Sequence, residues 1–128
     1  MRDWRAAGLN VPCGIKGIKA QLATVEGLDG LSIGRLADEV GMSKGGLYAH
    51  FRSKLDLQLA TVATAGDVFR QEVIDPGEAA PPGTARILAL CDAFLSHVER
   101  GVFPGGCFFV AAAAEMNVRP GPVRDSIA

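Results

Sequence analysis

The stretch GLSIGRLADEVGMSKGGLYAHFRSKLDL, residues 30–57, contains the clearest structural pattern of the chain. Ser32 begins a short helix, because its hydroxyl can accept hydrogen bonds from the free N–H groups of the first turn. The apolar residues that follow recur at intervals of three and four and so share one helical face: Ile33, Leu36, Ala37 and Val40. Gly41 then provides a left-handed end to this helix.

A second short helix follows the turn Gly41-Met42-Ser43. Ser43 can act as its N-cap, and Leu47 and Phe51 lie four residues apart on one face. Two short one-sided helices joined by a tight turn and held against a third form a helix-turn-helix, which places one helix in the DNA major groove. We therefore predict an all-α fold with a helix-turn-helix between Ser32 and Phe51.

The same kind of pattern divides the rest of the chain. Residues 1–14 lack periodicity and predict a flexible arm, and a first helix starts at Ile15 and completes a three-helix DNA-binding head over residues 15–60. The remaining residues, 61–128, predict part of a helical ligand-binding and dimerisation domain. A capping box at Ser53 and Asp56 starts a long helix between the two parts.

Several expectations concern the second part. The long helix should carry an apolar stripe and stop at Asp75-Pro76-Gly77, before a linker over 76–83. The stripe consists of Leu55, Leu59, Val62, Ala63, Phe69 and Val73. The next helix, starting at Thr84, should bury a wide face made of Ile87, Leu88, Cys91, Phe94, Leu95 and Val98. Residues 107–116 are apolar nearly all round and should be central to a core.

The composition excludes several classes of protein. Apolar residues make up 48% and charged residues 21% of the 128 residues, which is typical of a soluble globular protein. No apolar run approaches the roughly 20 residues of a membrane span, and the N-terminus does not resemble a secretory signal, so we expect a cytoplasmic protein. The three cysteines, Cys13, Cys91 and Cys107, suit buried reduced thiols better than a disulfide or a metal site, and no cofactor is indicated.

Charge is distributed unevenly along the chain. The net charge is −1, but residues 1–60 hold eight Lys/Arg against six Asp/Glu. Between Ser43 and Lys54 the chain contains Lys44, Arg52 and Lys54 and no acidic residue. If Leu47 faces inward, the helical period turns Lys44, Gly45 and Tyr48 outward, where a lysine and a phenol can meet phosphates. The patch favours nucleic acid as a partner.

Residues 31–54 resemble the DNA-binding head of the tetracycline-repressor (TetR) family. The shared elements are the apolar-patterned helix, Gly-apolar-Ser, Lys-Gly-x-apolar-aromatic, His-Phe and Ser-Lys. The resemblance implies a ligand-responsive regulator, usually a repressor, that binds double-stranded operator DNA. By position it implies these DNA contacts: Ser32, Ser43, Lys44, Gly45, Tyr48, His50 and Lys54. A weaker resemblance over GGCFFVAAAAEMNVRPGPVRDSI, starting at Gly105, points to the family's ligand domain.

The resemblance also implies an unknown small-molecule effector and a homodimer in the full-length protein. The family's last helices would lie beyond Ala128, so we expect a C-terminally truncated chain that dimerises poorly alone. Four residues of the second part are candidates for lining an effector cavity: Cys91, Phe94, Phe108 and Met116. The sequence leaves open whether they line a cavity or form plain core.

Two other functions compete with DNA binding. A helical protein-interaction module would expose an apolar groove where this chain has its basic run. A small thiol enzyme would use Cys91 or Cys107 with His97, but no acidic residue is spaced to orient that histidine, so we expect no catalytic site. Within the head, the corresponding structural alternatives are half-buried packing for Tyr48 and, for His50, a helix-end residue that satisfies free carbonyl groups.

Overall fold

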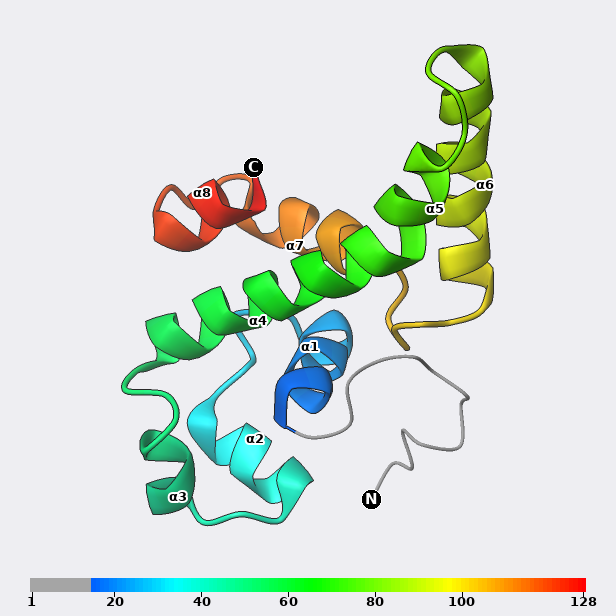
Figure 1. Ribbon diagram of the computed structural model, residues 1–128. Coiled ribbons are helices and arrows are strands. Elements are labelled where there is room, and N and C mark those ends of the chain that lie inside the picture. Colours follow the sequence, from blue (N-terminus) through cyan, green and yellow to red (C-terminus); the bar gives the residue numbers. More distant parts are fainter. Residues whose placement is uncertain (1–14) are drawn as a thin grey trace.

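The computed structural model describes residues 15–128, and the predicted arm, residues 1–14, lies outside them. The described chain is all helical and contains no strand, which confirms the predicted fold class. Figure 1 shows the arrangement of the helices. They are α1 (Ile15–Glu26), α2 (Ile33–Val40), α3 (Lys44–Tyr48), α4 (Lys54–Phe69), the π-helical segment η1 (Arg70–Ile74), α5 (Asp75–Glu78), α6 (Thr84–Glu99), α7 (Phe108–Met116) and α8 (Pro122–Ile127).

The predicted helix starts and the predicted turn are confirmed. The hydroxyl oxygens of Ser32, Ser43 and Ser53 each accept a hydrogen bond from the backbone N–H three residues later, at 3.1 Å. Gly41 ends α2 in the left-handed conformation, with φ 71° and ψ 29°. These signals act within one turn of helix, so the local sequence is sufficient to specify them.

The core is built along α4, which packs against α1 on one side and α8 on another. Its buried residues are Leu57, Gln58, Thr61, Val62, Thr64, Ala65 and Val68. The predicted stripe was therefore partly wrong, because Leu55 is 42% exposed and Ala63 is also on the solvent side. The buried threonines explain the error: Thr61 and Thr64 donate to the carbonyls of Leu57 and Ala60, so they fit the core without being apolar. The predicted division at residue 60 falls inside α4.

The predicted stop at Asp75-Pro76-Gly77 was wrong, and so was the start of the linker at residue 76. The chain passes through η1 and continues helically to Glu78. Proline cannot donate a hydrogen bond, and its ring clashes with the carbonyl four residues earlier in a regular α-helix. The wider π-helical register before Pro76, in which the Asp75 N–H donates to the Arg70 carbonyl, relieves this clash.

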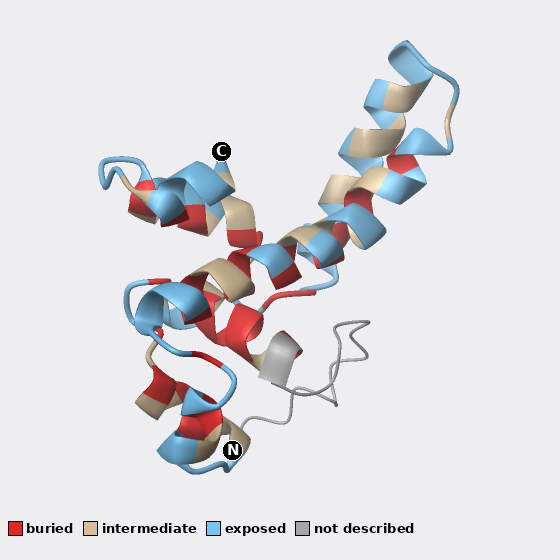
Figure 2. Ribbon diagram, turned by 60° about the vertical axis from the view of Figure 1, so that its left-hand side comes forward, coloured by how far each residue is buried: buried red, intermediate tan, exposed pale blue. Residues whose placement is uncertain are grey.

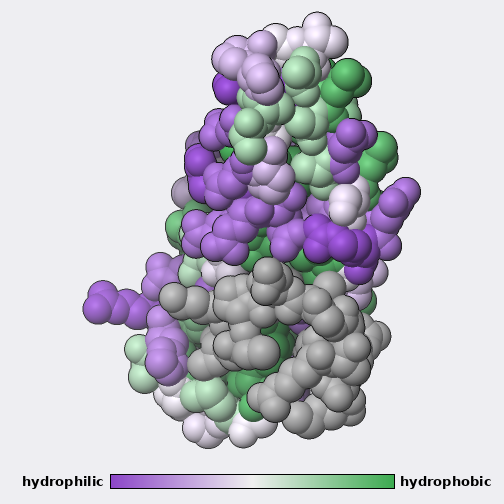
Figure 3. Space-filling view, turned by 45° about the vertical axis from the view of Figure 1, so that its right-hand side comes forward, coloured by the Kyte–Doolittle hydropathy of each residue, from purple (hydrophilic) through white to green (hydrophobic). Residues whose placement is uncertain are grey.

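The predicted burial of the α6 face was also wrong. Ile87, Leu88 and Leu95 are 62%, 60% and 55% exposed, and Cys91 is exposed instead of buried. Helix α6 contacts α5 and η1 with its other side and forms an arm that projects from the rest of the molecule (Figures 1 and 2). Apolar surface is accordingly visible over this upper region in Figure 3. Periodicity identified an apolar face correctly but could not show what covers it.

Helix α7 buries one face only, which corrects the expectation that residues 107–116 are central to the core. Phe108, Ala112 and Met116 are buried, whereas Val110 is 63% exposed. Alanines on the exposed side made the segment look apolar all round. Cys107 is buried, as expected. No helix among residues 15–128 is long and apolar enough to cross a membrane.

An aromatic cluster joins α4, α6 and α7, and His97 is part of it. The His97 ring lies edge-on to Phe69 and Phe103, at centroid distances of 5.9 and 6.0 Å. His97 is 2% exposed, and its Nδ1 has no hydrogen-bond partner among the described residues. Burial lowers the pKa of His97, the neighbouring Glu72 partly opposes that effect, and Arg100 adds to it. The imidazole is therefore neutral in the folded protein at neutral pH.

This burial makes the stability of the fold depend on pH. Because the pKa of His97 is lower folded than unfolded, the unfolded chain binds more protons as the pH falls below about 6.5. The free energy of unfolding then decreases progressively as the pH falls from about 6.5 towards the pKa of His97 in the folded protein. We expect the thermal midpoint of the wild type to fall between about pH 7.5 and pH 5.5 and the fall to be smaller in His97→Phe. Equal profiles for wild type and His97→Phe would contradict this role of His97.

Candidate nucleic-acid interface

Helix α3 is anchored from one side and exposed on the other. Leu47 is fully buried, and Phe51, just after the helix, is 8% exposed. Lys19 of α1 places its ammonium group 5.0 Å from the centroid of the Phe51 ring, which adds a cation–π contact to the packing. These anchors fix the rotation of α3 and turn its opposite face to solvent.

The exposed face consists of the residues that the sequence nominated. Ser43, Lys44 and Gly45 are exposed at the start of α3, and Tyr48 is 56% exposed one turn later. More than half of the Tyr48 surface is therefore accessible to a partner. The run Ser43–Lys54 contains no acidic residue, so no carboxylate within it opposes the positive charges.

Lys44 is the cation closest to the turn between α2 and α3. Its side-chain stem passes over Gly34, where an added Cβ would lie 3.1 Å from Cε of Lys44. Lys44 has no ion-pair or hydrogen-bond partner among residues 15–128. By contrast, Arg35 of α2 is paired with Glu26 at 2.8 Å and Glu39 at 2.9 Å, and its pKa is raised mainly by the hydrogen bond to Glu26. Lys44 is thus available to an external anion, whereas two carboxylates offset the charge of Arg35.

The two serine caps keep a hydrogen-bond donor. Ser32 and Ser43 each use the hydroxyl oxygen to accept a backbone N–H, which leaves the hydroxyl proton free to donate. Ser43 is exposed, and Ser32 is half-buried at the start of α2. Both hydroxyls can therefore donate to a phosphate without loss of the cap.

His50 and Arg52 lie in the turn that follows α3. His50 is exposed, its ring centroid lies 6.4 Å from that of Phe51, and its backbone N–H donates to the Leu47 carbonyl. Arg52 is exposed and, within the described part of the chain, unpaired. Sequence reasoning omitted Arg52 from the site residues, although its charge in the acid-free run was a sufficient signal.

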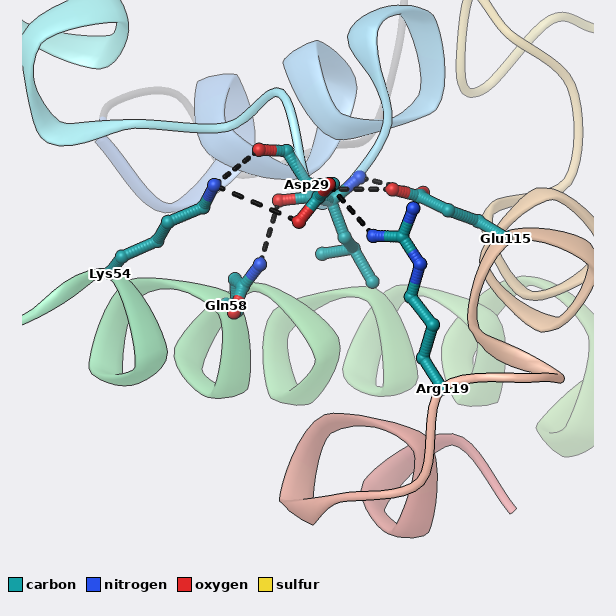
Figure 4. Close-up of polar contacts among 6 residues, drawn as sticks. Asp29, Lys54, Gln58, Glu115 and Arg119 are labelled. Atoms are coloured by element: carbon teal, nitrogen blue, oxygen red, sulfur yellow. Dashed lines mark hydrogen bonds and ion pairs between the residues drawn. The ribbon is translucent and has the colours of Figure 1, made fainter.

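Lys54 differs from Lys44 because its charged group has partners within the chain. Its ammonium group donates to the main-chain carbonyl of Asp29, in the loop between α1 and α2, and lies 3.8 Å from the Asp29 carboxylate. The same carboxylate accepts from Arg119 at 2.7 Å (Figure 4). Asp29 and Arg119 were not found from the sequence, because they are 90 residues apart and no local pattern connects them.

The residues nominated for an effector are not gathered around one cavity. Phe94 and Phe108 belong to the aromatic cluster, in which Phe94 lies 6.4 Å from Phe69 and Phe108 5.3 Å from Phe109, between ring centroids. Cys91 is on the exposed face of α6. Met116 lies elsewhere, where it lines an open cleft of about 190 Å³ beside Asp29, Gln58 and Arg119.

Comparison with known proteins agrees with this geometry. Residues 20–61 match the family model described as "Bacterial regulatory proteins, tetR family", and residues 83–128 match "Tetracyclin repressor-like, C-terminal domain". The crystal structure of a TetR-family transcriptional regulator from Streptomyces coelicolor superposes with a TM-score of 0.72 at 26% sequence identity. The match covers 96% of this chain and 61% of that one. No match was found among curated proteins.

Proposed function

The chain belongs to the TetR family of transcriptional regulators, and on this basis we propose that it binds double-stranded DNA with the exposed face of α3. The interface consists of Ser32, Ser43, Lys44, Gly45, Tyr48, His50 and Lys54, with Arg52 added. Regulators of this family are not enzymes, so the thiol-enzyme alternative is abandoned.

The observation that carries the proposal is the exposed surface formed by the run from Ser43 to Lys54, which contains no acidic residue of its own. Two of its cations, Lys44 and Arg52, have no partner among the described residues and can approach phosphates directly. Most protein–DNA hydrogen bonds go to phosphates and sugars, which position the protein but do not read the sequence. Lys44, Tyr48 and the serine hydroxyls suit this positioning role.

A titration with labelled DNA tests the proposal. The full 128-residue chain is added to a fluorescent 30-base-pair duplex from the promoter of its own gene, and in parallel to one of random sequence. We expect binding to both, tighter for the promoter duplex, and loss of affinity with increasing salt. Absence of binding to either duplex at low salt would contradict the proposal.

Gly45 separates the requirements of folding from those of DNA binding. An added Cβ at Gly45 would meet no atom within 4 Å, so Gly45→Ala should stabilise α3 by up to about 1 kcal/mol. If DNA approaches the backbone there, the same methyl group should weaken binding. We expect a higher thermal midpoint together with a larger dissociation constant for DNA. Equal or tighter DNA binding by Gly45→Ala would show that the duplex does not approach α3 at this residue.

We further propose that the protein acts as a repressor in the bacterial cytoplasm and is released from DNA by a small molecule. The aromatic cluster containing Phe94 and Phe108 supports an apolar effector site, with Cys91 and Met116 as more distant candidates. The full-length protein is proposed to act as a homodimer, because two-fold dimers read two half-sites of an operator.

A further inference from the structure

The loop between α1 and α2 is held by residues from the C-terminal part of the chain. The Glu115 carboxylate accepts hydrogen bonds from the backbone N–H groups of Leu28 and Asp29, both at 2.8 Å. Gln58 of α4 donates to the Leu28 carbonyl at 2.9 Å, and the Leu28 side chain is 1% exposed. The position of this loop is therefore fixed from α4 and α7 together (Figure 4).

The loop conformation depends on Gly27. Its φ of 81° is one that other residues rarely adopt, and a Cβ there would lie 3.0 Å from both carboxylate oxygens of Glu115. A glycine thus allows the carboxylate to reach the two N–H groups. This arrangement places Asp29 between two cations, Lys54 from the DNA-binding surface and Arg119 from the turn before α8.

The charges in this cluster determine how much of the Lys54 charge remains available. Asp29 carries one negative charge, and the closer of its two cations is Arg119, at 2.7 Å against 3.8 Å for Lys54. Hydrogen bonding from Arg119 is the main reason that the pKa of Asp29 is lowered, so the carboxylate is fully ionised at neutral pH. Without Arg119, the carboxylate would be left to Lys54 alone and would offset its charge.

We propose that Arg119 is a positioning residue for DNA binding: by pairing with Asp29 it leaves the charge of Lys54 available to a DNA phosphate, which the ammonium group can reach with the N–H donors that it does not use on the Asp29 carbonyl. Glu115 holds the loop in the position that this requires. The inference rests on the proposed DNA-binding function and adds to it a residue, 65 positions after Lys54, on which that binding depends.

The test compares variants of the full chain on a labelled 30-base-pair duplex of random sequence. Arg119→Ala is expected to weaken binding about two- to fivefold, the range of an exposed ion pair, and to lower the salt dependence. Arg124→Ala removes a nearby exposed cation whose only ion pair within residues 15–128 is with Asp125, at 3.8 Å, and it serves as the control for a general loss of charge. Asp29→Asn in the Arg119→Ala background should restore affinity, because it removes the carboxylate that Arg119 offsets.

The outcomes separate this inference from the function beneath it. Wild-type chain that binds no DNA would overturn both proposals. Wild-type binding with equal effects of Arg119→Ala and Arg124→Ala would overturn the role of Arg119 alone. The same applies if the double variant binds as weakly as Arg119→Ala, because a merely structural contribution of Arg119 would not be restored by Asp29→Asn. Circular-dichroism melts of each variant establish that the comparison is between folded proteins.

Discussion

Replacing Phe51 by alanine is expected to unfold the helix-turn-helix head. Truncating a buried aromatic side chain costs about 3 to 5 kcal/mol, and small domains have only about 5 to 15 kcal/mol in total. Phe51 is 8% exposed, packs in the same core as Leu47 and Leu57, and lies beneath the ammonium group of Lys19. Its removal leaves a cavity at the point where α3 joins α4.

Circular-dichroism melts measure this effect. Phe51→Ala should lower the thermal midpoint strongly or abolish the transition, and DNA binding should be lost together with the fold. Phe51→Leu is the matched variant, since it retains an apolar side chain and should lose much less stability. Tyr48→Ala removes an aromatic group that is 56% exposed and should melt close to the wild type. A Phe51→Ala melt that matches the wild type would exclude Phe51 as a core anchor.

Reversing the charge of Lys44 is expected to weaken binding to all DNA sequences by more than about tenfold. A hydrogen bond to a charged group contributes about 1.5 to 3 kcal/mol, and each 1.4 kcal/mol is a factor of ten in affinity. Lys44→Glu removes that contact and places a carboxylate against the phosphates. Because Lys44 is exposed and has no partner within the described chain, the fold should be unaffected.

Arg70→Glu provides the matched control. Arg70 is an exposed cation of η1, at the opposite end of α4 from α3, and its substitution changes the net charge by the same amount (Figure 1). The two variants should therefore differ strongly in DNA affinity if the contact is local. Similar losses for Lys44→Glu and Arg70→Glu would show that only the overall charge matters and would contradict an interface on α3.

The parts of the fold that depend on local chemistry were predictable from sequence. Serine caps at Ser32 and Ser43 and the left-handed Gly41 act within one helical turn, and all were confirmed. The exposed face of α3 was predictable for the same reason, because burial of Leu47 determines which neighbours point outward. The absence of acidic residues between Ser43 and Lys54 could be read directly from the sequence.

The remaining features depend on contacts between distant segments. The exposed apolar face of α6 could not be predicted, because periodicity identifies an apolar face whether or not another helix covers it. The passage of the helix through Pro76 depends on a shift to π-helical hydrogen bonding that no residue pattern indicates. The pairing of Asp29 with Arg119 requires the tertiary structure, and it changes the interpretation of Lys54 from a free cation to a shared one.

The salt dependence of DNA binding tests the central claim most directly. The dissociation constants of wild type, Lys44→Ala and Arg70→Ala are measured on the random-sequence duplex over a series of salt concentrations. If α3 binds phosphates, Lys44→Ala should reduce the log–log slope by about one unit, whereas Arg70→Ala should leave it unchanged. A wild-type slope retained in Lys44→Ala would contradict the assignment of α3 as the DNA-binding surface.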